Sequence, residues 1–142
     1  MTVAHVAHSS RRPIRDGLLQ FDPPRLLGSH CKVCDTRTFP PRDFCPACLR
    51  DGPHDVVPLA ASGTVFSYTV VHQAPGGRRT PYVLAYIDLD DAVRVLARVD
   101  APGDQVQVGD KVELVLQEAG ESEGVSLVGY AFVPSALKSG AE

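Results

Sequence analysis

The sequence Cys31-Lys32-Val33-Cys34 is matched ten residues later by Cys45-Pro46-Ala47-Cys48, and the chain has no other cysteine. Each C-x-x-C pair can form a tight knuckle whose two thiolates point inward. Two facing knuckles make the tetrahedral Cys₄ site that Zn²⁺ prefers. The spacing therefore predicts a zinc ribbon that binds one Zn²⁺ per chain, with four ligands: Cys31, Cys34, Cys45 and Cys48.

Other chemistries could use the same cysteines. Two disulfides would suit a secreted domain, but small secreted frameworks carry a signal peptide and denser, less regular cysteines. A single C-x-x-C pair is typical of a thioredoxin-like redox centre, which the second pair at ribbon spacing disfavours. Iron in a rubredoxin-like site needs the same four ligands. Zinc is favoured because nothing else in the chain indicates electron transfer.

Length and composition narrow the class of protein. A chain of 142 residues that is 44% hydrophobic suits one soluble domain, or one small core with a metal-stapled module. The formal net charge of −3 argues against nucleic acid as the main partner, because phosphate binding depends on a basic surface. No apolar run approaches the ~20 residues of a membrane span. Residues 1–13 lack the apolar core of a signal peptide, so we expect a cytoplasmic protein.

Proline, glycine and polar stretches divide the chain into four predicted segments. Residues 1–13 are a flexible leader, 14–58 hold an N-terminal segment and the ribbon, 59–134 form a β domain, and 135–142 are a tail. Residues 49–62 are expected to be a linker. Directly after the first knuckle, Asp35 occupies a position that often requires a positive φ.

The β domain has five expected strands, at residues 63–72, 82–89, 92–99, 111–116 and 125–133. The third alternates clearly, with Val95 and Ala97 on one face and Leu96 on the other, between Arg94 and Arg98. Five strands, the first one long, favour a closed OB-fold barrel, which removes exposed sheet edges. An open five-stranded meander or an SH3-like barrel is the alternative. The predicted fold is mainly β: a zinc ribbon followed by an OB-fold.

The order of the short motifs resembles a known family. The chain is similar to two-part proteins in which a rubredoxin-like zinc ribbon precedes an OB-fold, encoded beside thiolases and other acyl-CoA enzymes. The resemblance runs from about residue 14 to 134. Besides the two knuckles, it rests on these motifs: Arg25-Leu26-Leu27-Gly28-Ser29-His30, Phe39-Pro40-Pro41-Arg42, Gly63-Thr64-Val65, Pro81-Tyr82, Val108-Gly109-Asp110 and Phe132-Val133-Pro134. Asp35 departs from the family, where glycine is common.

This resemblance implies a non-catalytic subunit that binds a thiolase-like enzyme or carries acyl-CoA to it. The partner reactions of the family are acyl transfer and thiolytic or retro-aldol C–C cleavage. The implied setting is the degradation of aromatic or steroid-like acyl-CoA compounds. The implied partners are therefore a thiolase-like enzyme and an acyl-CoA. Binding to nucleic acid or to a membrane is not expected.

Two sets of residues are candidates for these roles. Arginines bind phosphate through forked hydrogen bonds, and CoA carries three phosphates, so Arg78, Arg79 and Arg42 are candidate CoA contacts. The apolar stretch before the ribbon has little core of its own, so it is a candidate partner interface. Its five apolar residues are Leu18, Leu19, Phe21, Leu26 and Leu27.

No residue is a convincing catalyst. A fully Cys-ligated zinc has no open position for water, and no serine stands in a local histidine–acid arrangement. His72, at the end of the first strand, is expected to be a rim residue rather than a general base. Two alternatives remain: a nucleic-acid-binding ribbon/OB protein, and an enzyme or electron carrier in its own right.

Overall fold

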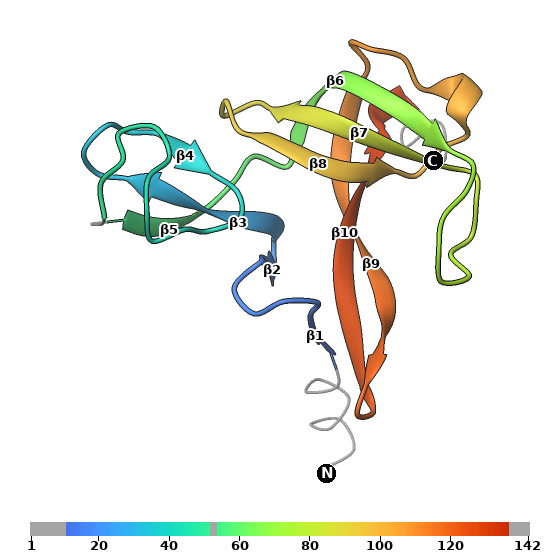
Figure 1. The fold of residues 1–142 in the computed structure, drawn as a ribbon, viewed down its shortest axis with the longest axis horizontal. Helices are drawn as coiled ribbons and strands as arrows, with labels where there is room; N and C mark the ends of the chain where they lie inside the picture. Colours follow the sequence, from blue (N-terminus) through green and yellow to red (C-terminus); the bar gives the residue numbers. More distant parts are fainter. Residues whose placement is uncertain (1–10, 52–53, 137–142) are drawn as a thin grey trace.

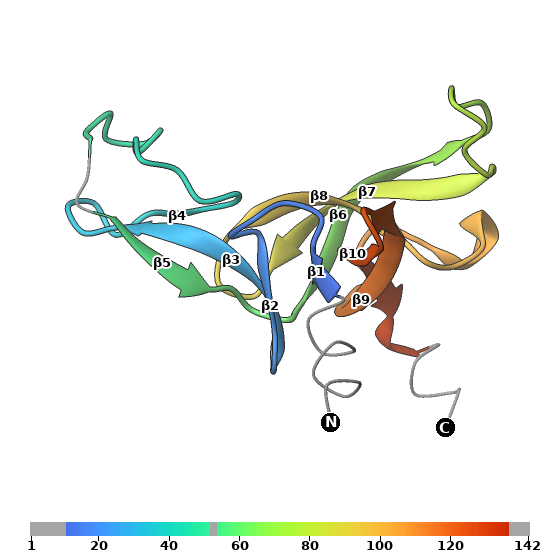
Figure 2. The same ribbon diagram turned by 90° about the horizontal axis from the view of Figure 1, so that it is seen from below.

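The computed structural model describes residues 11–51 and 54–136, whose regular secondary structure is almost all β-strand, with a short 3₁₀ helix at Gly103–Gln105. Strands gather into a four-stranded sheet and a six-stranded sheet. Figures 1 and 2 show the smaller sheet at one end of the molecule and the larger at the other. The predicted fold class is confirmed. In the described part of the chain no helix has the length and apolar character needed to cross a membrane.

The smaller sheet is built around one strand that ends at the first metal-binding cysteine. β3 pairs antiparallel with β2 along its first half, and with β4 and β5 along its second half. The strands are β2 (Leu19–Phe21), β3 (Pro24–Cys31), β4 (Arg37–Thr38) and β5 (His54–Pro58). β5 lies inside the stretch predicted to be a linker, so that prediction is wrong for residues 54–58.

The larger sheet closes into a five-stranded barrel. Its order is β6-β7-β8-β10-β9, and β9 returns to pair with β6. All barrel pairings are antiparallel except that of β8 with β10. This closed arrangement is that of an OB-fold rather than an open meander. The strands are β6 (Ser62–Val71), β7 (Tyr82–Leu89), β8 (Arg94–Val99), β9 (Lys111–Ser122) and β10 (Val125–Pro134).

The alternation predicted for the third barrel strand is confirmed. In β8, Val95, Ala97 and Val99 are buried, whereas Arg94, Leu96 and Arg98 are exposed. The buried set joins the apolar interior of the barrel. The exposed set makes the outer face of β8, where a leucine lies between two arginines.

The β9–β10 hairpin is longer than predicted and projects beyond the barrel (Figure 1). The fourth strand is predicted to end at residue 116, but β9 continues to Ser122 and the chain reverses at Glu123 and Gly124, which both have positive φ. Along this hairpin β1 (Arg11–Pro13) pairs parallel with β10. Residues 11–13 therefore form a strand, in contrast to the predicted leader. Residues 1–10 of that leader, and 137–142 of the tail, lie outside the described residues.

The ribbon and the barrel share one hydrophobic core. Leu19 and Leu26 of the smaller sheet, and Leu59 of the connection, belong to the same buried cluster as Phe132 of the barrel. The connection is also held by a hydrogen bond from the backbone N–H of Ala60 to the Asp91 carboxylate, 2.8 Å long. Unfolding of the ribbon would therefore uncover part of the barrel's own core.

Candidate functional site

Two knuckles with the same backbone design present the four cysteines. Cys31 ends β3, and its carbonyl accepts a hydrogen bond from the N–H of Asp35 (2.9 Å); Cys45 receives the same bond from Leu49 (2.8 Å). Asp35 and Leu49 both have positive φ, at 67° and 65°. The prediction for Asp35 is confirmed. The equivalent strain at Leu49 was missed, because leucine gives no hint of a left-handed backbone.

The four sulfur atoms lie at the spacing of a tetrahedral metal site. Cys31 Sγ is 3.7 Å from Cys48 Sγ, and Cys34 Sγ is 3.5 Å from Cys45 Sγ. All four sulfurs lie within 4.8 Å of one another. A tetrahedral ion with metal–sulfur bonds of about 2.3 Å would separate its ligands by roughly 3.8 Å. The predicted residues are therefore brought together in a geometry that fits one metal ion.

The surroundings of the four thiols lower the pKa of Cys34 and raise that of Cys48. The Thr36 hydroxyl and backbone N–H hydrogen-bond the sulfur of Cys34 and lower its pKa to about 6. Burial, followed by the neighbouring sulfurs, raises the pKa of Cys48 to about 12. Four thiolates this close repel one another, so without a cation the cluster keeps protons. A bound divalent ion would displace them.

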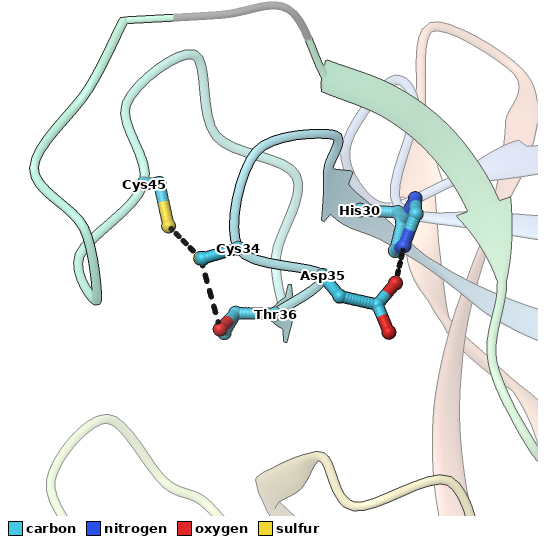
Figure 3. Close-up of polar contacts among 5 residues, drawn as sticks. All are labelled: His30, Cys34, Asp35, Thr36 and Cys45. Carbon is cyan, nitrogen blue, oxygen red and sulfur yellow. Dashed lines mark hydrogen bonds and ion pairs between the residues drawn. The ribbon is translucent and has the colours of Figure 1, made fainter.

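A second polar pair lies beside the first knuckle. The His30 ring nitrogen and the Asp35 carboxylate form a close hydrogen bond, and Figure 3 shows the two side chains pointing at each other, with Cys34 between Cys45 and Thr36. The contact with His30 lowers the pKa of the Asp35 carboxyl. Within the described residues, the candidate metal-binding group consists of the four cysteines alone. His30 therefore braces the knuckle turn and is not a fifth ligand.

Family comparisons agree with this two-part layout. Residues 21–54 match the model of the ChsH2 rubredoxin-like zinc ribbon domain, and residues 56–117 match that of the ChsH2 C-terminal OB-fold domain. A DUF35 domain-containing scaffold protein of Methanocaldococcus jannaschii is 38% identical over an alignment of 114 residues that covers 77% of this chain and 81% of the relative. The chain belongs to the ChsH2 family of DUF35 proteins.

Two further members of this DUF35 family are informative. The benzoylsuccinyl-CoA thiolase subunit BbsA of Thauera aromatica is 33% identical, over 77% of this chain and 76% of its own length. A solved structure described as the Ltp2-ChsH2(DUF35) aldolase is 32% identical, with a TM-score of 0.62 over 78% of this chain and 85% of that one. These three proteins are thus named as a scaffold, a thiolase subunit and part of an aldolase.

The three arginines predicted to contact CoA are not brought together in this DUF35 chain. Arg78 lines a groove of about 400 Å³ in which the second arginine is Arg98. Arg79, although adjacent in sequence, is not part of that lining. Arg42 lies in the ribbon, where its backbone carbonyl accepts a hydrogen bond from the Ser29 hydroxyl (3.0 Å). From the sequence, Arg94 and Arg98 share one strand face that could either line a groove or cover the barrel exterior, and in the structure Arg98 lines the groove.

The premise of an exposed apolar stretch before the ribbon is contradicted. Leu18, Leu19 and Leu26 are buried, and Leu19 and Leu26 belong to the shared core. Phe21 and Leu27 are half-buried. These three leucines therefore offer no free surface to a partner.

One group of exposed apolar side chains lies on β6, β7 and β8. They are Phe66, Tyr68, Tyr86 and Leu96, with 50%, 37%, 47% and 47% of their surface exposed. A shallow hollow of about 330 Å³ lies among the side chains of this region, lined in part by Leu84, Tyr86 and Leu96. The sequence did carry one signal of this surface, since Leu96 falls at an outward position between two arginines.

Proposed function

We propose that this chain is a non-catalytic, zinc-binding accessory subunit of a thiolase-type enzyme. The observation that carries the proposal is the metal centre, in which four cysteines complete a tetrahedral ligand set. Such a site leaves no position for water or substrate, so its ion stabilises the fold and does no chemistry. The naming of related proteins as scaffolds and thiolase subunits supports the same role.

The proposed metal is zinc, bound by Cys31, Cys34, Cys45 and Cys48. It would link two knuckles that are too small to fold on their own apolar surface. Elemental analysis of the purified chain tests this directly. Zinc gives a colourless Cys₄ site, whereas iron would give visible absorption and would support an electron carrier instead.

The proposed partner reaction is the cleavage or transfer of an acyl group carried by CoA, with an aromatic or steroid-like acyl chain, in the cytoplasm. Support for the substrate class comes from the two BbsA relatives, which are 33% and 30% identical. The test is reconstitution with the thiolase-type enzyme of the same organism. We expect stable co-purification and acyl-CoA cleavage by the complex. Cleavage by the isolated chain would contradict the non-catalytic role.

We further propose that the enzyme contacts the outer surface of β6–β8, together with the half-buried Phe21 and Leu27. Protein interfaces are enriched in aromatic residues and arginine. Here Phe66 and Tyr86 are exposed, and the Arg94 guanidinium lies 3.6 Å from the centre of the Phe66 ring. These groups could bury apolar area against an enzyme without rearrangement of the barrel.

A charge introduced on this surface tests the interface. Leu96→Glu should weaken co-purification strongly, since it would replace apolar contact area with a carboxylate that loses its water when the partner covers it. The matched control is Val108→Glu, at an apolar residue that is 64% exposed on the loop before β9. Equal loss of the enzyme by both variants would argue against this location.

A further inference from the structure

A groove with two arginines in its lining lies between three parts of the barrel. Arg98 comes from the outer face of β8, Arg78 from the loop between β6 and β7, and Gln117 and Tyr130 from β9 and β10. In OB-folds, ligands bind on the face of the second and third strands, between the loops that follow the first and fourth strands. Here those elements are β7, β8, the β6–β7 loop and the β9–β10 hairpin. The groove is lined by β8, the β6–β7 loop and the strands of the β9–β10 hairpin, so it overlaps the region where this fold binds its ligands.

The two arginines of the groove favour an anionic ligand. In the described part of the chain, no carboxylate lies within ion-pair distance of Arg78 or Arg98. Arg94, on the same strand, is instead paired with Asp88 at 2.6 Å. Arg98 lies over the Tyr82 ring, with 5.2 Å between the guanidinium carbon and the ring centre, so stacking orients it while its N–H groups stay available. Two such guanidiniums suit the forked recognition of phosphate.

Two other residues of the groove lining can contact a ligand: the Tyr130 ring forms a wall, and Gln117 offers a hydrogen-bond acceptor. The Tyr130 hydroxyl donates to the Leu96 carbonyl (3.2 Å), and this bond holds the ring in place. The amide nitrogen of Gln117 donates to Asp100 (3.0 Å), which leaves the Gln117 carbonyl oxygen as the group it can offer to a ligand. Glu118 also lines the groove. The Glu118 carboxylate would repel a phosphate placed next to it. A bound phosphate is therefore expected beside Arg78 and Arg98.

An apolar surface begins next to this cationic groove. Leu96 and Arg98 both point outward from β8 and are two residues apart, which is about 7 Å along a strand. Leu96 lines the apolar hollow and Arg98 lines the groove. A ligand that fits both is an amphipathic phosphate ester, with a phosphorylated end and a long, less polar arm.

We infer that the groove binds the phosphorylated nucleotide end of the acyl-CoA, with Arg78 and Arg98 on its phosphates. The arm then runs past Tyr130 toward Leu96 and enters the contact between this chain and the enzyme. This inference rests on the proposed function and adds its ligand contacts. Arg98 replaces Arg79 and Arg42 as the partner of Arg78.

The experiment is calorimetric titration of the metal-loaded full chain with CoA and with adenosine 3′,5′-bisphosphate, which represents the nucleotide end alone. Arg78→Ala and Arg98→Ala should each weaken binding of both ligands roughly tenfold or more, because each removes a charge-assisted contact. The matched control is Arg79→Ala, which removes the same charge from the next position of the same loop. It should bind as the wild type does.

Three outcomes would overturn the inference. These are a wild-type chain that binds neither probe at millimolar concentration, an equal loss in all three variants, and tighter binding of a single-stranded oligonucleotide than of CoA. Co-purification with the enzyme, measured on the same variants, separates this inference from the proposed function. If the complex forms but the substitutions leave CoA binding unchanged, only the groove assignment fails. If the wild-type chain forms no complex, the proposed function fails.

Discussion

The ring of Phe39, in the metal ribbon, meets the ring of Tyr130, on β10, edge to face, with 5.7 Å between ring centres and 88° between ring planes. Tyr130 in turn lines the cationic groove and donates to the Leu96 carbonyl. One aromatic contact thus links the ribbon to the wall of the groove.

This contact predicts that Phe39→Ala destabilises the chain by about 2 kcal/mol. The figure is below the ~3–5 kcal/mol of a fully buried phenylalanine, because Phe39 is only half-buried. Urea unfolding measures the loss. The control is Phe44→Ala, in the same ribbon at a side chain that is 47% exposed, which should cost much less. Equal losses in the two variants would mean that the contact with Tyr130 adds nothing.

Two strand glycines should respond differently to alanine. A Cβ at Gly63 would lie 2.5 Å from the backbone oxygen of Asp88, whereas a Cβ at Gly129 would meet nothing closer than 3.5 Å. Gly63→Ala must therefore push apart paired strands, and we expect a loss of about 1–3 kcal/mol. Gly129→Ala should be nearly neutral. Thermal unfolding of both variants checks the difference, and a stable Gly63→Ala protein would contradict it.

The sequence predicted best where the pattern is local. Alternation located β8 because each residue's face follows from its neighbours, and the cysteine spacing located the metal ligands for the same reason. β5 was missed because it is short and pairs with β3, more than twenty residues earlier in the chain. Nothing in its own residues indicates that pairing.

The groove and the shared core could not be predicted in the same way. Arg78 and Arg98 lie twenty residues apart and line one groove because β7 pairs with β8, which sets Arg98 opposite Leu84, while the closed barrel adds Gln117 and Tyr130. Leu19 and Leu26 pair across β2 and β3 and then pack against the barrel, so apolar residues that seemed to need a partner already have one. Both results depend on tertiary packing, about which local periodicity carries no information.

The Asp88–Arg94 pair predicts a small loss of stability at low pH. The hydrogen bond from Arg94 holds the pKa of the Asp88 carboxyl below its usual value. A carboxyl whose pKa is lower in the folded chain stabilises it above the unfolded pKa of about 4, and that contribution disappears as pH falls through the folded pKa. Both side chains are more than 40% exposed, so the pair is worth at most about 1 kcal/mol.

Asp88→Asn tests this sign, because it removes the titrating group and keeps the shape. The variant should be slightly less stable than the wild type at pH 7 and equally stable near pH 2. Denaturant unfolding across that range gives the comparison. A difference that persists unchanged at pH 2 would show that the carboxylate charge is not the cause.

Cys45→Ser should remove the metal and destabilise more than the ribbon. With three thiolates the site loses a ligand that is 2% exposed, and the knuckles have little apolar surface of their own to keep them folded. Because Leu19 and Leu26 lie in the barrel's core cluster, loss of the ribbon should also lower the midpoint of barrel unfolding. Metal content and urea unfolding are the two measurements. The control is Ala47→Ser, at an exposed residue between Cys45 and Cys48. It should leave the metal content and the unfolding midpoint unchanged. A Cys45→Ser protein that keeps a full equivalent of metal and its stability would contradict the four-cysteine site.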